Sequence, residues 1–87
     1  MIRVVVQVDG PNVMEMTVSG HANAADKGED LICAGVSAIT VGTLNALDEL
    51  VNGSTNDSMK EGYIHIRVNS VNPTQQTILQ SMLIQLK

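Results

Sequence analysis

The chain has 87 residues, a formal net charge of −4, one tyrosine and no phenylalanine or tryptophan. This length fits one small domain spanning residues 1–87 and excludes two, and the lack of large aromatic residues predicts a thin core of Val, Ile, Leu, Met and Ala. The negative charge argues against a nucleic-acid-binding protein, which needs a basic face for phosphates, and favours a basic protein partner.

The first two elements predicted are the strands of a β-hairpin. Residues 1–8 alternate, with Ile2, Val4, Val6 and Val8 on one face. Residues 9–12, Asp-Gly-Pro-Asn, are a dense turn signal, and residues 13–19 resume the alternation with Met14, Met16 and Val18 on one face. His21 would therefore follow the end of the second strand.

A polar segment separates this hairpin from the next apolar run. It consists of Ala22, Asn23, Ala24, Ala25, Asp26, Lys27, Gly28 and Glu29. Such a segment is either an ordinary strand-to-helix connection or a flap that orders over a site when substrate binds. We expect the flap, because the two ends of the segment carry the histidine and the cysteine, and we expect the backbone to bend at Gly28.

The main helix is predicted over residues 31–51, where Val36, Ile39, Leu44 and Leu47 follow helical spacing. Asp30 is a good N-cap residue, which would place Cys33 about at the third helical position. Residues 52 and 53, Asn-Gly, would end the helix, with glycine in the left-handed cap position.

The rest of the chain reads as a loop, a strand and a second helix. Residues 54–62 are polar and predict an exposed loop, and residues 63–68 alternate cleanly as a strand with His65 in its exposed set. Asn72-Pro73 followed by Gln75 is a capping-box pattern, and the apolar stripe of the helix after it begins at Ile78. The fold class predicted is α+β, two layers, with both helices on one face of a small sheet in the order β-β-α-β-α.

His21 and Cys33 are the candidate chemical groups. A thiol in the first helical turn is favoured as the thiolate by the unpaired N–H groups of the helix start and by a cationic histidine, while Asp30 opposes this unless it caps the helix or orients the imidazole. The backbone N–H groups of the helix start could also receive an oxyanion. Against this stands a simpler interpretation, in which the cysteine is a small buried hydrophobe and the histidine a surface residue.

The motif around these residues resembles the signature of the ribosomal-processing cysteine protease family, Prp. The resemblance rests on Gly20-His21-Ala22, Gly28, Asp30 and the block Ile-Cys-Ala-Gly-Val-Ser-Ala at residues 32–38, and it includes the spacing from histidine to cysteine. It implies a catalytic dyad of His21 and Cys33, supported by Gly20, Asp30 and Ser37. It also implies an endopeptidase that removes an N-terminal extension from ribosomal protein L twenty-seven of the large subunit.

Several alternatives and partner expectations stay open at this stage. Ser37 either bonds its own i−4 carbonyl or orients the site, and the alternative to a protease is a non-catalytic dimeric module that binds a basic ribosomal protein. Family members continue past the second helix, so either this chain continues past Lys87 or its last element is missing. No metal or other cofactor is expected, because one cysteine and two histidines form no close ligand pair.

Location and assembly follow from composition. A single cysteine fits a reducing compartment, and the sequence contains no long apolar run and no signal-peptide pattern, so we expect a cytoplasmic protein that binds neither membrane nor nucleic acid. A thin core favours burial of apolar surface by self-association, and we expect a homodimer.

Overall fold

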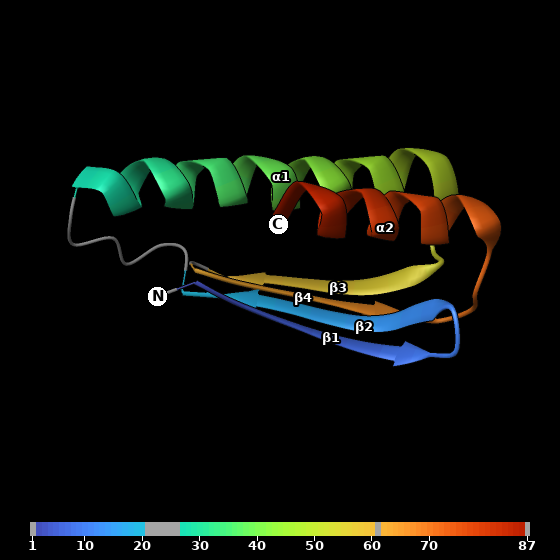
Figure 1. Cartoon of the computed structure of the whole chain (residues 1–87). Helices are drawn as coiled ribbons and strands as arrows, with labels where there is room; N and C mark the ends of the chain where they lie inside the picture. Colours follow the sequence, from blue (N-terminus) through green and yellow to red (C-terminus); the bar gives the residue numbers. More distant parts are fainter. Residues whose placement is uncertain (1, 21–26, 61, 87) are drawn as a thin grey trace.

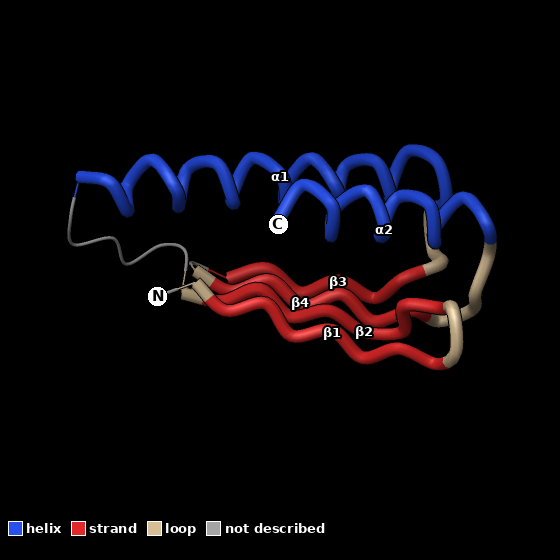
Figure 2. Tube along the Cα trace, viewed as in Figure 1, coloured by secondary structure: helices blue, strands red, loops and turns tan. Residues whose placement is uncertain are grey.

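The computed structural model describes residues 2–20, 27–60 and 62–86, and residues 27–33 by their backbone alone. In chain order the elements are β1 (Arg3–Asp9), β2 (Asn12–Ser19), α1 (Lys27–Val51), β3 (Thr55–Lys60), β4 (Tyr63–Val68) and α2 (Pro73–Leu86). The four strands form one antiparallel sheet in the order β1-β2-β4-β3, and both helices cover the same face of it (Figures 1 and 2). The predicted two-layer α+β fold is confirmed.

The predicted element order was wrong in one place, because residues 55–60 form strand β3 and not part of an exposed loop. The order is therefore β-β-α-β-β-α. The segment Thr-Asn-Asp-Ser-Met-Lys has almost no apolar alternation, and β3 is largely exposed at the edge of the sheet. Its strand conformation comes from backbone pairing with β4, from Thr55 opposite Val68 to Lys60 opposite Tyr63. Propensity is a weak guide for an edge strand, since pairing with a neighbour decides its conformation.

The predicted start of the main helix was also wrong. Helix α1 begins at Lys27, so Asp30 lies inside the helix and cannot be its N-cap. Lys27, Gly28 and Glu29, which were predicted as the end of a flap, are helical. Good helix formers such as Lys and Glu extend the helix toward the N-terminus before the apolar periodicity begins. The predicted end holds, because α1 ends at Val51 and Gly53 has a φ of +84°.

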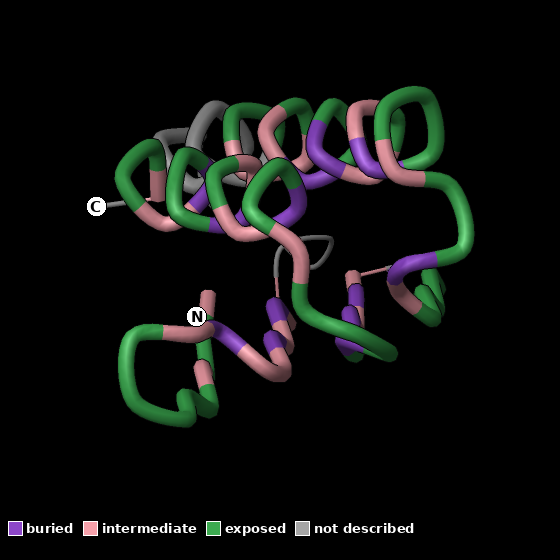
Figure 3. The backbone as a smooth tube through the Cα atoms, turned by 90° about the vertical axis from the view of Figure 1, so that its right-hand side faces the viewer, coloured by how far each residue is buried: buried purple, intermediate pink, exposed green. Residues whose placement is uncertain are grey.

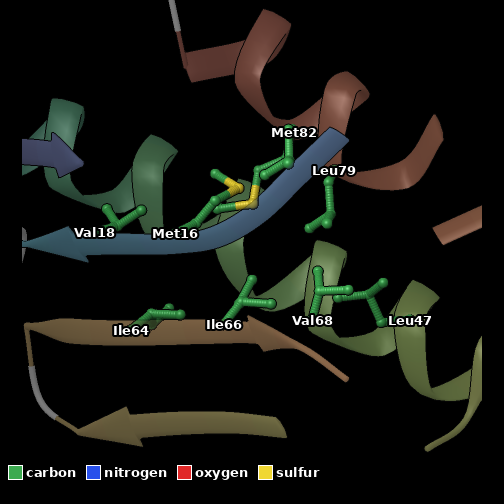
Figure 4. Close-up of a cluster of buried hydrophobic side chains, with 9 residues drawn as sticks. Met16, Val18, Leu47, Ile64, Ile66, Val68, Leu79 and Met82 are labelled. Carbon is green, nitrogen blue, oxygen red and sulfur yellow. The ribbon is translucent and has the colours of Figure 1, made fainter. Parts of the chain in front are cut away.

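The core lies between the helices and the inner face of the sheet. Figure 3 shows buried positions of the two layers facing each other. The buried hydrophobic side chains are Val13, Met16, Val18, Leu47, Ile64, Ile66, Val68, Leu79 and Met82, and eight of these are labelled in the close-up of Figure 4. Two methionines therefore fill the space between β2 and α2, as expected for a core without large aromatic residues.

A register shift in β2 changes which residue of its first half enters the core. Gln7 pairs with Glu15, but Val8 pairs with Val13, so Met14 is an extra residue on β2. Val13 is consequently buried and Met14 is only partly buried. The predicted alternation held for Met16 and Val18 and failed for Met14, because a bulge shifts the side-chain period by one residue.

The start of α2 is tied to the rest of the molecule by side-chain amides. Asn72 caps the helix as predicted, with its Oδ1 accepting the Gln75 N–H at 2.8 Å. Gln75 does not complete the capping box. It is fully buried, and its Nε2 donates to the carbonyl oxygens of Ser54 and Ser70, each at 3.0 Å. Gln76 pairs with the backbone of Val13 through two hydrogen bonds of 2.8 and 2.9 Å, which fixes α2 over the start of β2.

Neither helix, as far as the structure describes them, combines the length and the apolar character needed to cross a bilayer.

Candidate active site

The first fixed point of the candidate site is the end of β2. Gly20 follows the last residue of this strand, and its N–H donates to the carbonyl oxygen of Gly62 at 2.8 Å. Gly20 has a φ of +84°, a left-handed conformation that costs any residue with a Cβ free energy. The position before His21 therefore favours glycine, because the chain leaves the sheet there in a left-handed conformation.

Six residues of the predicted site lie outside the described residues. They are His21, Ala22, Asn23, Ala24, Ala25 and Asp26, which are the proposed base and most of the predicted flap. The described backbone fixes the two ends of this segment at Gly20 and Lys27. Figure 1 shows that the first turns of α1 lie near the end of the sheet at which β2 ends, so both ends of the segment are on the same side of the molecule.

The backbone of Cys33 lies in α1, six residues after the first helical residue. At 3.6 residues per turn this is the second turn and not the first. The effect of the helix dipole falls off within the first turn, and the unpaired N–H groups are those of the first four residues. The prediction that Cys33 lies in the first helical turn is therefore wrong, and the helix dipole is a weaker reason for a thiolate there than the sequence indicated.

The supporting residues Asp30 and Ser37 are both on α1. Asp30 lies three residues before Cys33 and Ser37 four residues after it, so all three have the spacing that places helical residues on a shared face. Ser37 is half-buried, and its backbone carbonyl accepts a hydrogen bond from Oγ1 of Thr40 at 3.1 Å. The backbone positions of Asp30, Cys33 and Ser37 therefore follow one another along α1 at intervals of about one turn.

His65 lies on the other side of the sheet. Along β4, His65 stands between Ile64 and Ile66, whose side chains are buried against the helices. Its own side chain therefore faces away from the helix layer and hence from α1. It is half-buried, and its Nε2 contacts Oε2 of Glu15 on β2. His65 therefore lies on the outer face that the alternation predicted, although the contact with the Glu15 carboxylate and partial burial replace the full exposure that the sequence indicated.

One feature beside the site is missing from the sequence prediction. The left-handed turn at Gly20 faces a second one at Gly62, which has a φ of +72° in the connection between β3 and β4. The glycine at residue 62 is the sequence signal for a tight connection here, which the prediction of an exposed loop over residues 54–62 does not include. Among the side chains that the structure describes, no three His, Cys, Asp or Glu residues gather in a group that would bind a metal ion.

Comparison with known proteins identifies the family. A family model described as cysteine protease Prp matches residues 1–87. The ribosomal processing cysteine protease Prp of Staphylococcus aureus is 36% identical over 82 residues, which cover 91% of this chain and 77% of that protein.

Solved structures of the S. aureus protease have the same fold as this chain. The crystal structure of its complex with a substrate peptide superimposes with a TM-score of 0.83 at 32% identity, and the complex with a covalently linked product peptide with 0.84 at 36%. Each comparison covers 99% of this chain and 85% of the other. Match length, identity and fold agree, and the chain belongs to the cysteine protease Prp family.

Proposed function

We propose that this protein is an endopeptidase that removes the N-terminal extension of ribosomal protein L twenty-seven of the large ribosomal subunit. The observation that carries the proposal is the match of the whole chain to a family of cysteine proteases, one of whose S. aureus members has been crystallised with a covalently linked product peptide. A ribosomal protein as the substrate follows from the name of that relative, a ribosomal processing protease.

Cys33 and His21 carry the chemistry in this proposal. The thiolate of Cys33 attacks the carbonyl carbon of the scissile peptide bond, and His21 gives a proton to the leaving amine. Water then hydrolyses the thioester and releases the second product. Because Cys33 lies in the second turn of α1, an imidazolium beside the thiol is the main means of stabilising the thiolate.

Three further residues have positioning roles in the proposal. Gly20 sets the direction in which the chain reaches His21, which its φ of +84° supports. Asp30 and Ser37 lie within one turn of Cys33 on α1, before and after it. A carboxylate or a hydroxyl in these positions can orient the imidazole or a bound peptide.

Residues 22 to 26, with the first helical residues Lys27, Gly28 and Glu29, form the substrate flap of the proposal. The segment joins the elements that carry His21 and Cys33, so a peptide bound between these two residues must contact it. The acidic side chains in and beside the segment, from Asp26 to Asp30, suit a basic ribosomal protein.

The decisive test is incubation of the protein with the precursor of ribosomal protein L twenty-seven. We expect a shortened product with the wild-type chain and none with Cys33→Ala or Cys33→Ser, because both substitutions remove the nucleophile with a small change of volume. Circular dichroism checks that both variants are folded. Cleavage by either variant at the wild-type rate would refute Cys33 as the nucleophile.

Two finer expectations belong to the same proposal. The protein acts in the cytoplasm, where its proposed substrate is made, and it is a homodimer, because a core of small and medium-sized aliphatic residues gains from burial between two copies. The alternative of a non-catalytic binding module has no specific observation in its favour, since the family consists of cysteine proteases.

A further inference from the structure

The face of the sheet that the helices leave uncovered has an uneven distribution of charge (Figures 1 and 3). On β4, the residues that alternate with the buried Ile64 and Ile66 lie on this face, and so do their pairing partners on β3. These six residues, the β3–β4 surface, are Asn56, Ser58, Lys60, Tyr63, His65 and Arg67. They include two of the five lysine and arginine residues of the chain and none of its nine aspartate and glutamate residues.

The two cations of the β3–β4 surface have no carboxylate partner among the described side chains. Lys60 and Arg67 are both exposed. The one ion pair in the described part of the chain joins His65 to Glu15, which lies opposite Arg67 on β2. That carboxylate contacts the imidazole and makes no ion pair with Arg67. Two unpaired cations on an uncovered face suit an anionic partner.

The single tyrosine of the chain lies on the same surface. Tyr63 is directly opposite Lys60 and on the same face of β4 as Arg67. It is 38% exposed, in a protein whose sequence contains no phenylalanine or tryptophan. Bases of a single-stranded nucleic acid stack on exposed aromatic rings while neighbouring cations contact the phosphates. An uncovered ring beside two cations therefore fits a nucleotide chain better than it fits a simple anion.

The spacing of the two cations fits a short stretch of nucleotides. Lys60 and Arg67 are on adjacent strands and four residues apart along them, because Lys60 pairs with Tyr63. With about 3.4 Å per residue along a strand and about 4.8 Å between strands, their Cα atoms are about 14 Å apart. At about 3.4 Å per stacked base, roughly four nucleotides span this distance.

Hydroxyl groups in the same rows of the sheet favour RNA over DNA. His65 pairs with Thr17 on β2 and with Ser58 on β3, and Tyr63 pairs with Ser19 on β2. All of these side chains are on the uncovered face. Hydroxyl groups can both donate to and accept from the ribose 2′-hydroxyl, the group that distinguishes RNA from DNA.

We propose that the β3–β4 surface binds single-stranded RNA, with a base stacked on Tyr63 and phosphates at Lys60 and Arg67. The net charge of −4 disfavours nucleic acid for the chain as a whole, but the charge of the contacting face decides whether phosphates bind there. The surface lies on the side of the sheet opposite α1, which carries the backbone of Cys33. RNA binding is therefore an activity beyond the proposed protease and does not rest on it.

Fluorescence anisotropy with a labelled oligouridylate of about ten nucleotides tests the proposal. A probe of this length covers the site sizes usual for single-stranded nucleic acids. We expect binding at low salt that weakens as salt is added. The plot of log association constant against log salt concentration should have a slope of roughly −1.4, because each of two phosphate contacts contributes about −0.7.

Neutral substitutions of the two cations locate the binding face. Lys60→Gln and Arg67→Gln should each weaken binding by roughly five- to tenfold at low salt and reduce the salt slope by about 0.7. The matched control is Gln80→Glu on an exposed position of α2, which changes the net charge by the same amount in the helix layer. It should leave affinity and slope at their wild-type values. An equal loss in the control would show that binding follows net charge, and the proposal would be wrong.

Substitutions of the tyrosine test the stacking. Tyr63→Phe keeps the ring and should bind as the wild type does. Tyr63→Ile keeps an apolar residue suited to a strand and should weaken binding by about tenfold, without a change of salt slope because no phosphate contact is lost. Circular dichroism checks that both variants are folded. Wild-type affinity of the Tyr63→Ile variant would refute the stacked base.

Competitors distinguish RNA from other anionic partners. An oligodeoxyuridylate of the same length lacks only the 2′-hydroxyl groups and should bind more weakly, and a polyglutamate peptide should compete poorly because it has no bases to stack. Equal affinity for the deoxy probe would overturn the assignment to RNA, and efficient displacement by polyglutamate would indicate an acidic protein partner instead. Absence of RNA binding at low salt refutes the proposal outright. Failure to cleave the precursor, by contrast, concerns the protease proposal alone.

Discussion

The two histidines form a matched pair of residues for testing the dyad. Replacing His21 by alanine should lower precursor cleavage by about 10²- to 10⁴-fold, the usual contribution of a general acid or base. It should also slow alkylation of Cys33 near neutral pH, because loss of an imidazolium neighbour raises the pKa of a thiol.

His65→Ala is the control for this experiment. It removes a half-buried contact with Glu15 on the outer face of the sheet and should cost about 1 kcal/mol or less. Cleavage and alkylation should stay at their wild-type rates. If the two histidine variants behave alike in both assays, His21 is not the base.

Gly20 supports a second prediction at the scale of a residue. Gly20→Ala forces a Cβ into a left-handed conformation and should destabilise the fold by about 1 kcal/mol or more. Because the change redirects the chain just before His21, cleavage should fall more than the loss of stability explains.

Gly35→Ala provides the contrast for Gly20→Ala. Gly35 lies inside α1, and apart from its chain neighbours and the backbone of its own helix no described atom is within 4 Å of the position of an added Cβ. An alanine there should raise the melting temperature, since alanine is the better helix former. Thermal unfolding and precursor cleavage, measured on both variants, separate a general glycine effect from the local one at Gly20.

The junction between α2 and the strands shows how elements are joined through one amide. Gln75 is fully buried and donates to the carbonyls of Ser54 and Ser70. Gln75→Ala leaves both carbonyls without this donor and should cost about 2 kcal/mol, which corresponds to a fall in melting temperature of roughly 10 °C for a domain of this size. Gln85→Ala on the same helix, where the side chain is exposed and bonds only to Ser81, should change it little.

The proposed flap is a prediction about the connection between two elements. Amide hydrogen exchange in residues 22 to 26 should become slower when an uncleavable peptide of the cleavage site is bound, because the peptide supplies contacts and hydrogen bonds to this segment. Exchange in β3 should be unchanged and serves as the internal control. Equal protection of residues 22 to 26 with and without peptide would identify the segment as an ordinary connection.

At the scale of the whole molecule, the two layers divide the chain into faces with different roles. The helices cover one face of the sheet and leave the other uncovered (Figures 1 and 3). The nine buried hydrophobic side chains of the described residues lie between the layers, and His65, in contact with Glu15, is on the uncovered face. The first turns of α1 and the end of β2 lie at the same end of these layers (Figure 1). The elements on either side of the proposed flap therefore meet at one end of the molecule.

The sequence by itself determined the elements that have a local pattern. Alternation predicted β1, β2 and β4, helical spacing predicted the body of α1, and the Asn72-Pro73 cap predicted the start of α2. These signals are visible because hydrophobic periodicity and capping depend on neighbours within a few residues. The Gly-His motif and its spacing to Cys33 likewise indicated the family that the comparisons identify.

Tertiary structure alone decided the features that depend on distant partners. Strand β3 exists because its backbone pairs with β4, Val13 replaces Met14 in the core because a bulge shifts the register, and Gln75 is buried because two carbonyls from other segments need its amide. The extension of α1 back to Lys27 placed Cys33 in the second helical turn. Pairing partners, register and hydrogen-bond acceptors far along the chain leave no periodic trace in the residues that depend on them.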